Sequence, residues 1–181
     1  MRTLAKSFSL VLLGAALTLP TLSMASGPAP AKALLAEASA RALKEKKNVL
    51  VIFHASWCGW CHKLDDMLES PKFKSTFEKS YVITHVDVME NGPKKNLENE
   101  GGADLMAKFG AEKAGLPFFV VLSPAGKQLG DSFLPSKENM GFPSAPEEVS
   151  AFMVLLKKTA PKMSAGEQTT VEKFLRAPKA K

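Results

Sequence analysis

This 181-residue chain has two cysteines, Cys58 and Cys61, which lie three positions apart. Residues three apart on a first helical turn come within disulfide reach, so this C-x-x-C pair can exchange a disulfide with another molecule. His62 follows directly, and the same letters therefore also spell C-x-x-C-H, the signal for covalent attachment of a c-type haem. The motif allows both interpretations, and its setting has to separate them.

The start of the chain has the features of a secretory signal peptide. Arg2 and Lys6 precede an apolar run at 10–19, and a small-residue site predicts cleavage after Ala25. The run is too short for a transmembrane helix, which needs about 20 residues, so we expect no stable membrane insertion. The sequence predicts a signal peptide at 1–25 and a periplasmic or secreted protein.

Export places the two cysteines where disulfides form. A bond between Cys58 and Cys61 closes a very short loop, which contributes little to stability through chain entropy. We therefore expect these cysteines to serve chemistry rather than a structural framework.

The charge of the chain gives no sign of a nucleic-acid partner. Loss of Arg2 and Lys6 with the signal peptide lowers the formal net charge from +6 to +4. The remaining charges are interspersed, and the basic C-terminal end is interpreted as a solvated surface. Export also argues against binding to nucleic acid.

The elements around the motif are predicted from hydrophobic periodicity. A helix is expected at 32–47, with Leu35, Ala38, Ala42 and Leu43 on one face. The continuous apolar run at 49–53 predicts a strand buried on both faces. A helix then starts at Trp60, with Cys61, Leu64 and Leu68 on its inner face, and Ser70-Pro71 predicts the start of a further helix.

The rest of the chain continues the alternation of strands and helices. Strands are predicted at 81–88, 116–122 and 128–134, helices at 104–109 and 147–158, and loops at 89–102 and 135–146. Ser164 and Glu167 form a predicted capping box that opens a last helix, with Val171, Phe174 and Leu175 facing inward.

This order predicts an α/β fold with a central mixed sheet of four strands. The first two strands are joined through a helix and should be parallel, whereas the last two form a hairpin. Helices are expected on both faces of the sheet, with extra helices at the C-terminus. We expect one domain at 26–181, with a core at about 32–158 and a helical extension at 159–177.

The chain resembles the thioredoxin-like proteins, in particular exported thiol:disulfide oxidoreductases with a W-C-G-x-C motif. The resemblance rests on Trp57-Cys58-Gly59-Trp60-Cys61 between a buried strand and a helix, and on Gly115-Leu116-Pro117 at the start of a later strand. It covers residues 32–152 in order of elements. It implies a thioredoxin-like fold, a redox-active Cys58–Cys61 disulfide and a cis proline at Pro117 that packs against it.

Two departures from the family pattern concern the second cysteine and the redox potential. Typical thioredoxins carry a buried Asp six residues before the first cysteine, where this chain has Ile52. They also carry Pro between the cysteines, where this chain has Trp60. The proton acceptor for Cys61 therefore stays open.

Roles for the site residues follow from the motif and the resemblance. Cys58, at the helix N-terminus, should be exposed and attack first, because the helix dipole favours a thiolate there. Cys61 should face inward and resolve the mixed disulfide. Trp57 and Trp60 are predicted to bind substrate. The resemblance implies the same for Leu116 and Pro117, because a cis bond before Pro117 would expose the backbone of Leu116 to a bound peptide strand.

The histidines and acids near the motif receive lesser roles. His54, which ends the strand before the motif, is a candidate for tuning the thiolate pKa. His62 is expected at the surface and His85 is interpreted as structural. Asp65, Asp66 and Glu69 are interpreted as the solvated face of the helix.

We predict thiol–disulfide exchange with exported proteins that contain disulfides or thiols, in the reducing direction, with a membrane protein as electron donor. This chemistry needs no cofactor and no metal, and the second C-x-x-C of a zinc ribbon is absent. A disulfide oxidase or isomerase of the same fold is the alternative. A c-type haem protein is the alternative from a different class, since Met89, Met106, Met140 or Met153 could supply a second iron ligand.

Overall fold

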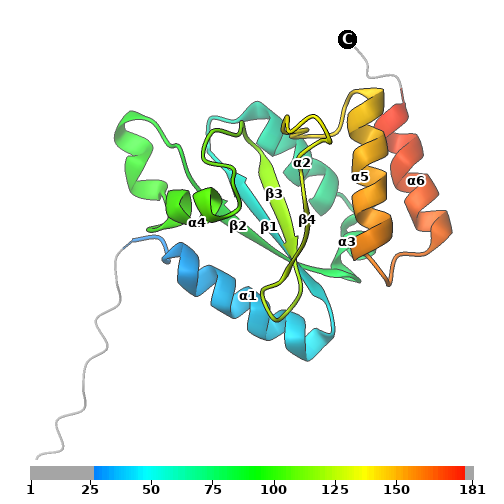
Figure 1. The fold of residues 1–181 in the computed structure, drawn as a ribbon, viewed down its shortest axis with the longest axis horizontal. Coiled ribbons are helices and arrows are strands. Elements are labelled where there is room, and N and C mark those ends of the chain that lie inside the picture. Colours follow the sequence, from blue (N-terminus) through cyan, green and yellow to red (C-terminus); the bar gives the residue numbers. More distant parts are fainter. Residues whose placement is uncertain (1–26, 178–181) are drawn as a thin grey trace, which may run out of the picture.

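The structure, a computed structural model, describes residues 27–177. The predicted signal peptide and its cleavage site lie outside these residues. Figure 1 shows a central sheet with helices around it, and a pair of helices, α5 and α6, side by side at one end.

The sheet has four strands in the order β2-β1-β3-β4. These strands are β1 (Asn48–His54), β2 (Tyr81–Asp87), β3 (Phe118–Leu122) and β4 (Gln128–Asp131). The β1 and β2 strands are parallel, whereas β3 is antiparallel to both β1 and β4. The predicted mixed sheet, its parallel pair and its C-terminal hairpin are confirmed.

The helices divide between the two faces of the sheet. The bounds are α1 (Ala31–Glu45), α2 (Gly59–Glu69), α3 (Lys74–Glu78), α4 (Gly102–Lys108), α5 (Pro146–Thr159) and α6 (Ala165–Arg176). The α1 and α4 helices pack on the face that carries Val49, Val51 and Phe53. The α2, α3, α5 and α6 helices pack on the opposite face, which carries Leu50 and Ile52.

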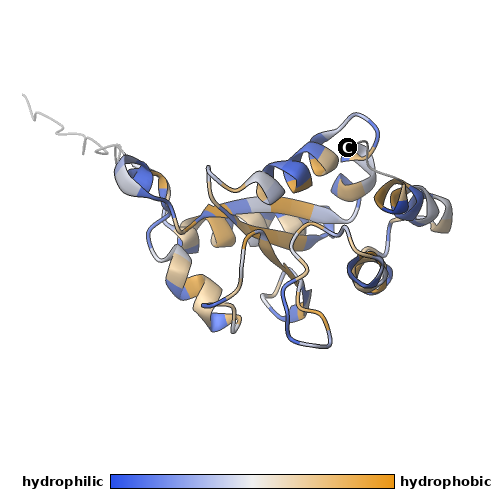
Figure 2. Cartoon of the chain, turned by 90° about the horizontal axis from the view of Figure 1, so that it is seen from above, coloured by the Kyte–Doolittle hydropathy of each residue, from blue (hydrophilic) through white to orange (hydrophobic). Residues whose placement is uncertain are grey.

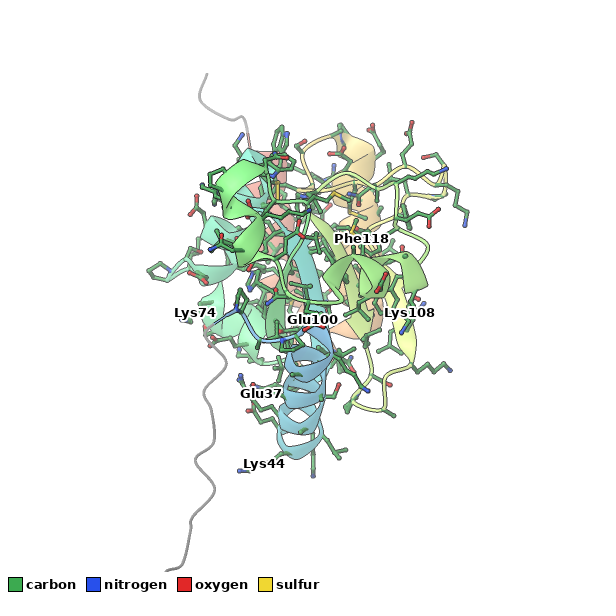
Figure 3. The ribbon with its side chains drawn as sticks, turned by 90° about the vertical axis from the view of Figure 1, so that its left-hand side faces the viewer. Glu37, Lys44, Lys74, Glu100, Lys108 and Phe118 are labelled. Carbon is green, nitrogen blue, oxygen red and sulfur yellow. A yellow bond between two sulfur atoms is a disulfide. The ribbon has the colours of Figure 1, made fainter. Side chains whose placement is uncertain are left out.

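Alternate residues of β1 enter the two cores because successive side chains of a strand point to opposite faces. The five central residues of β1 are all buried, which confirms the predicted strand covered on both faces. Figure 2 shows the strands as a mainly hydrophobic centre, with hydrophilic positions on the outer helices. In Figure 3, Phe118 lies within the fold, whereas Glu37 and Lys44 project from α1 into solvent.

Several local predictions were wrong. Leu43 was expected on the inner face of α1, but its side chain is 70% exposed, because the sheet covers only the narrow stripe of Ala31, Ala38 and Ala42. Ser70 ends α2 instead of capping a new helix, and α3 starts at Lys74.

Two further predictions near the loops and the C-terminus needed revision. The loop expected at 89–102 contains a short 3-10 helix, η1 (Gly92–Leu97). Phe174, which was predicted to face inward, is 41% exposed, because its ring packs edge-on against Phe73 at the rim of the core, with ring centroids 4.9 Å apart. The predicted capping box is confirmed, since the Ser164 hydroxyl accepts from the N–H of Glu167 and the Glu167 carboxylate accepts from the N–H of Ser164.

Candidate active site

The two cysteines form a disulfide where β1 gives way to α2. Cys58 is the N-cap residue of α2 and has extended backbone angles, while Cys61 lies in the first turn. The Cys61 N–H donates a hydrogen bond to the Cys58 sulfur, with the nitrogen and sulfur 3.1 Å apart. In the reduced protein the same N–H and the positive end of the helix dipole favour negative charge on Cys58.

Both cysteines are nearly covered by neighbouring residues. Cys58 is 4% exposed and Cys61 is 1% exposed, so the prediction that Cys58 is exposed was wrong. The reason is a small apolar cluster in which Ala55 and Leu116 pack against the disulfide. Cys58 remains the more accessible of the two sulfur-bearing residues.

Trp57 and Trp60 directly precede the two cysteines, and each has about half of its surface in solvent. Trp57 is 53% exposed, and its indole N–H donates to the Met89 carbonyl oxygen at 2.8 Å. Trp60 is 48% exposed and stacks against Phe142, with ring centroids 6.2 Å apart and planes inclined by 18°. The Lys63 ammonium lies over the Trp60 ring, 4.1 Å from its centroid.

Leu116 and Pro117 come to the disulfide from the loop before β3. The bond between them is cis, and Leu116 packs into the same small cluster as Cys58 and Cys61. The Asn139 side-chain amide fixes this loop by donating to the carbonyl oxygens of Gly115 at 2.7 Å and Pro117 at 2.9 Å. Sequence reasoning missed Asn139, which lies in the loop at 135–146 and has no motif to mark it.

A buried carboxylate anchors the other side of the motif. Glu90 accepts a hydrogen bond from the Ser56 backbone N–H at 2.5 Å and another from the Ser56 hydroxyl at 2.9 Å. The hydrogen bond from this N–H lowers the pKa of Glu90 below its ordinary value, while burial acts in the opposite direction. Glu90 also went unnoticed in the sequence, because it lies 34 residues from its partner.

His54 belongs to a cluster of two histidines and two acids beneath the start of α2. Its Nε2 lies 3.0 Å from the Asp87 carboxylate, and its Nδ1 lies 3.6 Å from Asp65. His85 Nε2 lies 2.9 Å from the other oxygen of Asp65, and the His54 and His85 rings are 4.8 Å apart. The interpretation of Asp65 as part of the solvated face was wrong, because this carboxylate joins two histidines and is only partly exposed.

The charges in this cluster shift the pKa values of its members. Burial lowers the pKa of His54, but the nearby carboxylates of Asp65 and Asp87 outweigh it, and the net shift is upward. Burial raises the pKa of Asp65, but its contact with His54 and its hydrogen bond with His85 prevail and hold that pKa far below its ordinary value. Burial raises the pKa of Asp87. The cluster therefore favours an ion pair between His54 and Asp65.

The position of the usual buried acid is apolar in this protein. Ile52 is fully enclosed in the core that also contains Leu64 and Leu68. Asp65 lies one helical turn after Cys61 on α2, and residues four apart share a helix face. The carboxylate of Asp65 is therefore placed on the Cys61 side of the helix, although it comes from a different element than the acid of typical thioredoxins.

The remaining candidates lie at the surface. His62 is exposed, as predicted, and its Nε2 lies 3.0 Å from the Ser56 carbonyl oxygen. Within residues 27–177, no group of three or more His, Cys, Asp or Glu side chains is arranged to hold a metal ion. In that same part of the chain, no helix combines the length and apolar character needed to cross a membrane.

Comparisons with known proteins agree with this geometry. Residues 31–124 match the sequence model of the family described as thioredoxin-like. Over 86 residues, the chain is 31% identical to a protein disulfide-isomerase of Hordeum vulgare and 30% identical to one of Triticum aestivum. Each match covers 48% of this chain, which spans only 14% of the length of either curated relative.

A solved structure has the same fold. The disulphide isomerase from Xylella fastidiosa Temecula1 is 22% identical, with a TM-score of 0.51 over 88% of this chain and 96% of its own. This likeness shows a common fold. The family match, which includes the cysteine pair, is consistent with thiol:disulfide oxidoreductase activity. The match to the family sequence spans more than half of the chain, and the protein belongs to the thioredoxin-like family.

Proposed function

We propose that this protein is an exported thiol:disulfide oxidoreductase that exchanges its Cys58–Cys61 pair with protein substrates and works as a reductase. The observation that carries the proposal is the hydrogen bond from the Cys61 N–H to the Cys58 sulfur at the N-terminus of α2. A sulfur held by a backbone N–H at a helix N-terminus ionises more readily than a free thiol.

The proposed reaction is two successive exchanges. The Cys58 thiolate attacks one sulfur of a substrate disulfide, forms a mixed disulfide and releases the other substrate sulfur as a thiolate. Cys61 then loses its proton and attacks the Cys58 sulfur, which releases the second substrate thiolate. The substrate gains two electrons, and the protein is left with the Cys58–Cys61 disulfide.

We assign substrate contacts to Trp57, Trp60, Leu116 and Pro117, which surround the disulfide. The backbone of Leu116 lies between two carbonyl groups that Asn139 fixes, and it is available to pair with an extended substrate segment. We assign His54 to pKa tuning through Asp65, which shares a helix face with Cys61.

Export and electron supply are parts of the same proposal. The apolar run at 10–19 and the small-residue site before Ser26 support a signal peptide at 1–25, with the working domain at 26–181 in the periplasm or outside the cell. A reductase there needs a continuous source of electrons, which a membrane donor would provide. Substrates would be exported proteins that contain disulfides or thiols.

Cysteine variants test the reaction. The protein should reduce the disulfides of insulin in the presence of a thiol donor, Cys58→Ser should abolish this activity, and Cys61→Ser should accumulate a mixed disulfide with the substrate. Equal insulin reduction by the wild type and Cys58→Ser would overturn the proposal. The equilibrium potential against glutathione gives the direction: a value near that of thioredoxin, about −270 mV, supports a reductase.

A disulfide oxidase or isomerase is the second candidate. The names of the curated relatives, which are protein disulfide-isomerases, favour it, and a potential above about −150 mV would indicate an oxidant.

The haem alternative has a separate test. An absorption band of haem that survives acid–acetone extraction of the purified protein would establish it, whereas family membership favours the dithiol.

A further inference from the structure

An aromatic groove leads away from the disulfide along α2. The groove has a volume of about 440 Å³, and its lining consists of Lys63, Asp66, Met67, Ser70, Lys72, Phe73, Phe142 and Phe174. At the end nearer the cysteines, Phe142 stacks against Trp60, the residue directly before Cys61. At the other end, the rings of Phe73 and Phe174 pack edge to face. Through Phe142 the groove thus borders on Trp60, a residue of the proposed active site.

Two elements outside the matched family segment complete this groove. Phe142 comes from the loop before α5, and Phe174 comes from α6, whereas the family match ends at residue 124. Figure 1 shows α6 beyond α5 at one end of the sheet, where it extends the fold past its central strands. The groove is therefore formed between the segment that carries the cysteines, which supplies residues 63–73 of its lining, and this chain's additions to that segment.

The groove lining carries two cations, Lys63 and Lys72, and one carboxylate, Asp66. The Lys63 ammonium lies over Trp60, and the Lys72 ammonium lies 5.1 Å and 5.5 Å from the ring centroids of Phe73 and Phe174. Among the ion pairs of residues 27–177, none involves Lys63 or Lys72. Both cations face rings, so they remain available to a carboxylate of a bound molecule.

We propose that this groove binds an extended segment of the substrate polypeptide that carries an aromatic side chain next to a carboxylate. The proposal rests on the proposed function and adds the substrate class to it. The aromatic side chain would lie between Phe142 and Phe174, and the carboxylate would pair with Lys72 or Lys63.

The length of the groove sets the position of the aromatic residue in the substrate. From Cys58, the N-cap of α2, to Met67 in the groove lining, the helix rises by roughly 14 Å at 1.5 Å per residue. An extended peptide covers that distance in about four residues at 3.3–3.4 Å each. The preferred substrate should therefore have its aromatic residue about four positions from the cysteine that is attacked.

Peptide disulfides test this spacing. Each peptide carries one cysteine that is disulfide-bonded to glutathione. A Phe-Glu pair lies two, four or six positions from this cysteine, on either side of it. In the reference peptides Gly-Glu replaces the Phe-Glu pair. Reduced wild-type protein should react fastest with the spacing of four, roughly tenfold faster than with the Gly reference, given what burial of a phenylalanine contributes. Equal rates for all peptides would overturn the proposed role of the groove in substrate binding but leave the proposed function intact.

Variants identify the groove as the source of the preference. Phe174→Ser should bring the ratio between the Phe and Gly peptides close to one, and Lys72→Glu should favour peptides with Phe-Lys over those with Phe-Glu. Val154→Ser is the matched control, because Val154 is an exposed apolar residue on α5 outside the groove lining. A ratio that stays at the wild-type value in Phe174→Ser would contradict the proposal.

A binding assay separates this proposal from the proposed function. Fluorescence anisotropy with peptides in which Ser replaces the cysteine measures docking without exchange, and it should show the same dependence on spacing and on Lys72. Peptide binding without any disulfide exchange would contradict the proposed function but not the peptide-binding role of the groove. Light scattering that shows a wild-type dimer and a monomeric Phe174→Ser would assign the groove to a second copy of the chain and overturn its role in substrate binding.

Discussion

The carboxylate of Glu90 holds Ser56 by two hydrogen bonds, 2.5 Å from its backbone nitrogen and 2.9 Å from its hydroxyl oxygen. Ser56 lies two residues before Cys58, and Trp57 between them is bonded to the neighbouring Met89 carbonyl. The segment after β2 thus fixes the loop that presents the first cysteine. Met89 itself has a positive φ of 57°, which turns the chain so that Glu90 points back at this loop.

Glu90→Ala should lower the free energy of unfolding by about 2 kcal/mol, because it leaves the partly buried N–H of Ser56 without its acceptor. Glu90→Gln should cost less, since an amide oxygen can still accept from Ser56. Urea unfolding of the oxidised protein at pH 7 measures both. Glu100→Gln, an exposed acid close by in the same segment, should leave the unfolding midpoint unchanged (Figure 3); a similar loss in this control would refute a specific role for Glu90.

The pair of His54 and Asp65 should make stability depend on pH. The pKa of His54 is raised, so its contribution is complete below about pH 6.5 and is lost as the pH rises through the raised value. The pKa of Asp65 is lowered, so its contribution is present above about pH 4 and is lost only in stronger acid. The pair should therefore stabilise most between about pH 4 and 6.5.

Asp65→Asn tests this dependence. The substitution should cost about 2 kcal/mol at pH 5.5 and clearly less at pH 9, where His54 is neutral in wild type and variant alike. Urea unfolding at the two pH values gives the difference. Asp66→Asn is the control, because Asp66 is the next residue on α2 and is exposed; the pair is refuted if Asp65→Asn costs the same at both pH values.

Asn139 should be required for the loop before β3. Asn139→Ala removes the donors to the Gly115 and Pro117 carbonyls and should lower the free energy of unfolding by about 2 kcal/mol. Asn139→Asp should be at least as harmful at pH 7, since a carboxylate would face two carbonyl oxygens. Ser136→Ala, at an exposed position of the same loop, serves as the control in urea unfolding. Stability of Asn139→Ala equal to that of the control would count against this role.

Placing the usual acid at Ile52 should be costly. Ile52→Asp would bury a carboxyl group in an apolar core, where its pKa rises and its ionised form is disfavoured. The variant should lose at least about 3 kcal/mol and become less stable as the pH increases from 5 to 8. Ile52→Asn, of similar shape but without charge, should show a comparable loss at pH 5 and no such slope. A parallel pH response of the two variants would show that the site accommodates the charge.

The sequence predicted the elements whose signal is local. The apolar run at 49–53 predicts a strand buried on both faces. The helical spacing of Cys61, Leu64 and Leu68 identifies the inner face of α2. The parallel pairing of β1 with β2 and the hairpin of β3 and β4 then followed from chain connectivity, whereas the pairing of β1 with β3 was not predicted. The exposed Leu43 shows where this reasoning stops, because periodicity marks an apolar stripe but not the width of the surface that covers it.

The polar framework of the site was not predictable in the same way. Glu90 and Asn139 act on residues 34 and 22 to 24 positions away, and such pairs leave no periodic pattern. Asp65 looked like one of three acids on an outer helix face until β1 and β2 brought two histidines against it. The burial of Cys58 likewise depends on Leu116, which only the folded sheet places beside it.

The chain has two tryptophans, and each one directly precedes a cysteine of the disulfide. All indole fluorescence of the protein therefore originates beside the redox centre. One indole is bonded to the Met89 carbonyl and the other stacks against Phe142, so the two emitters sense opposite sides of that centre. Replacing either tryptophan with phenylalanine leaves a protein with a single built-in optical probe of its own oxidation state.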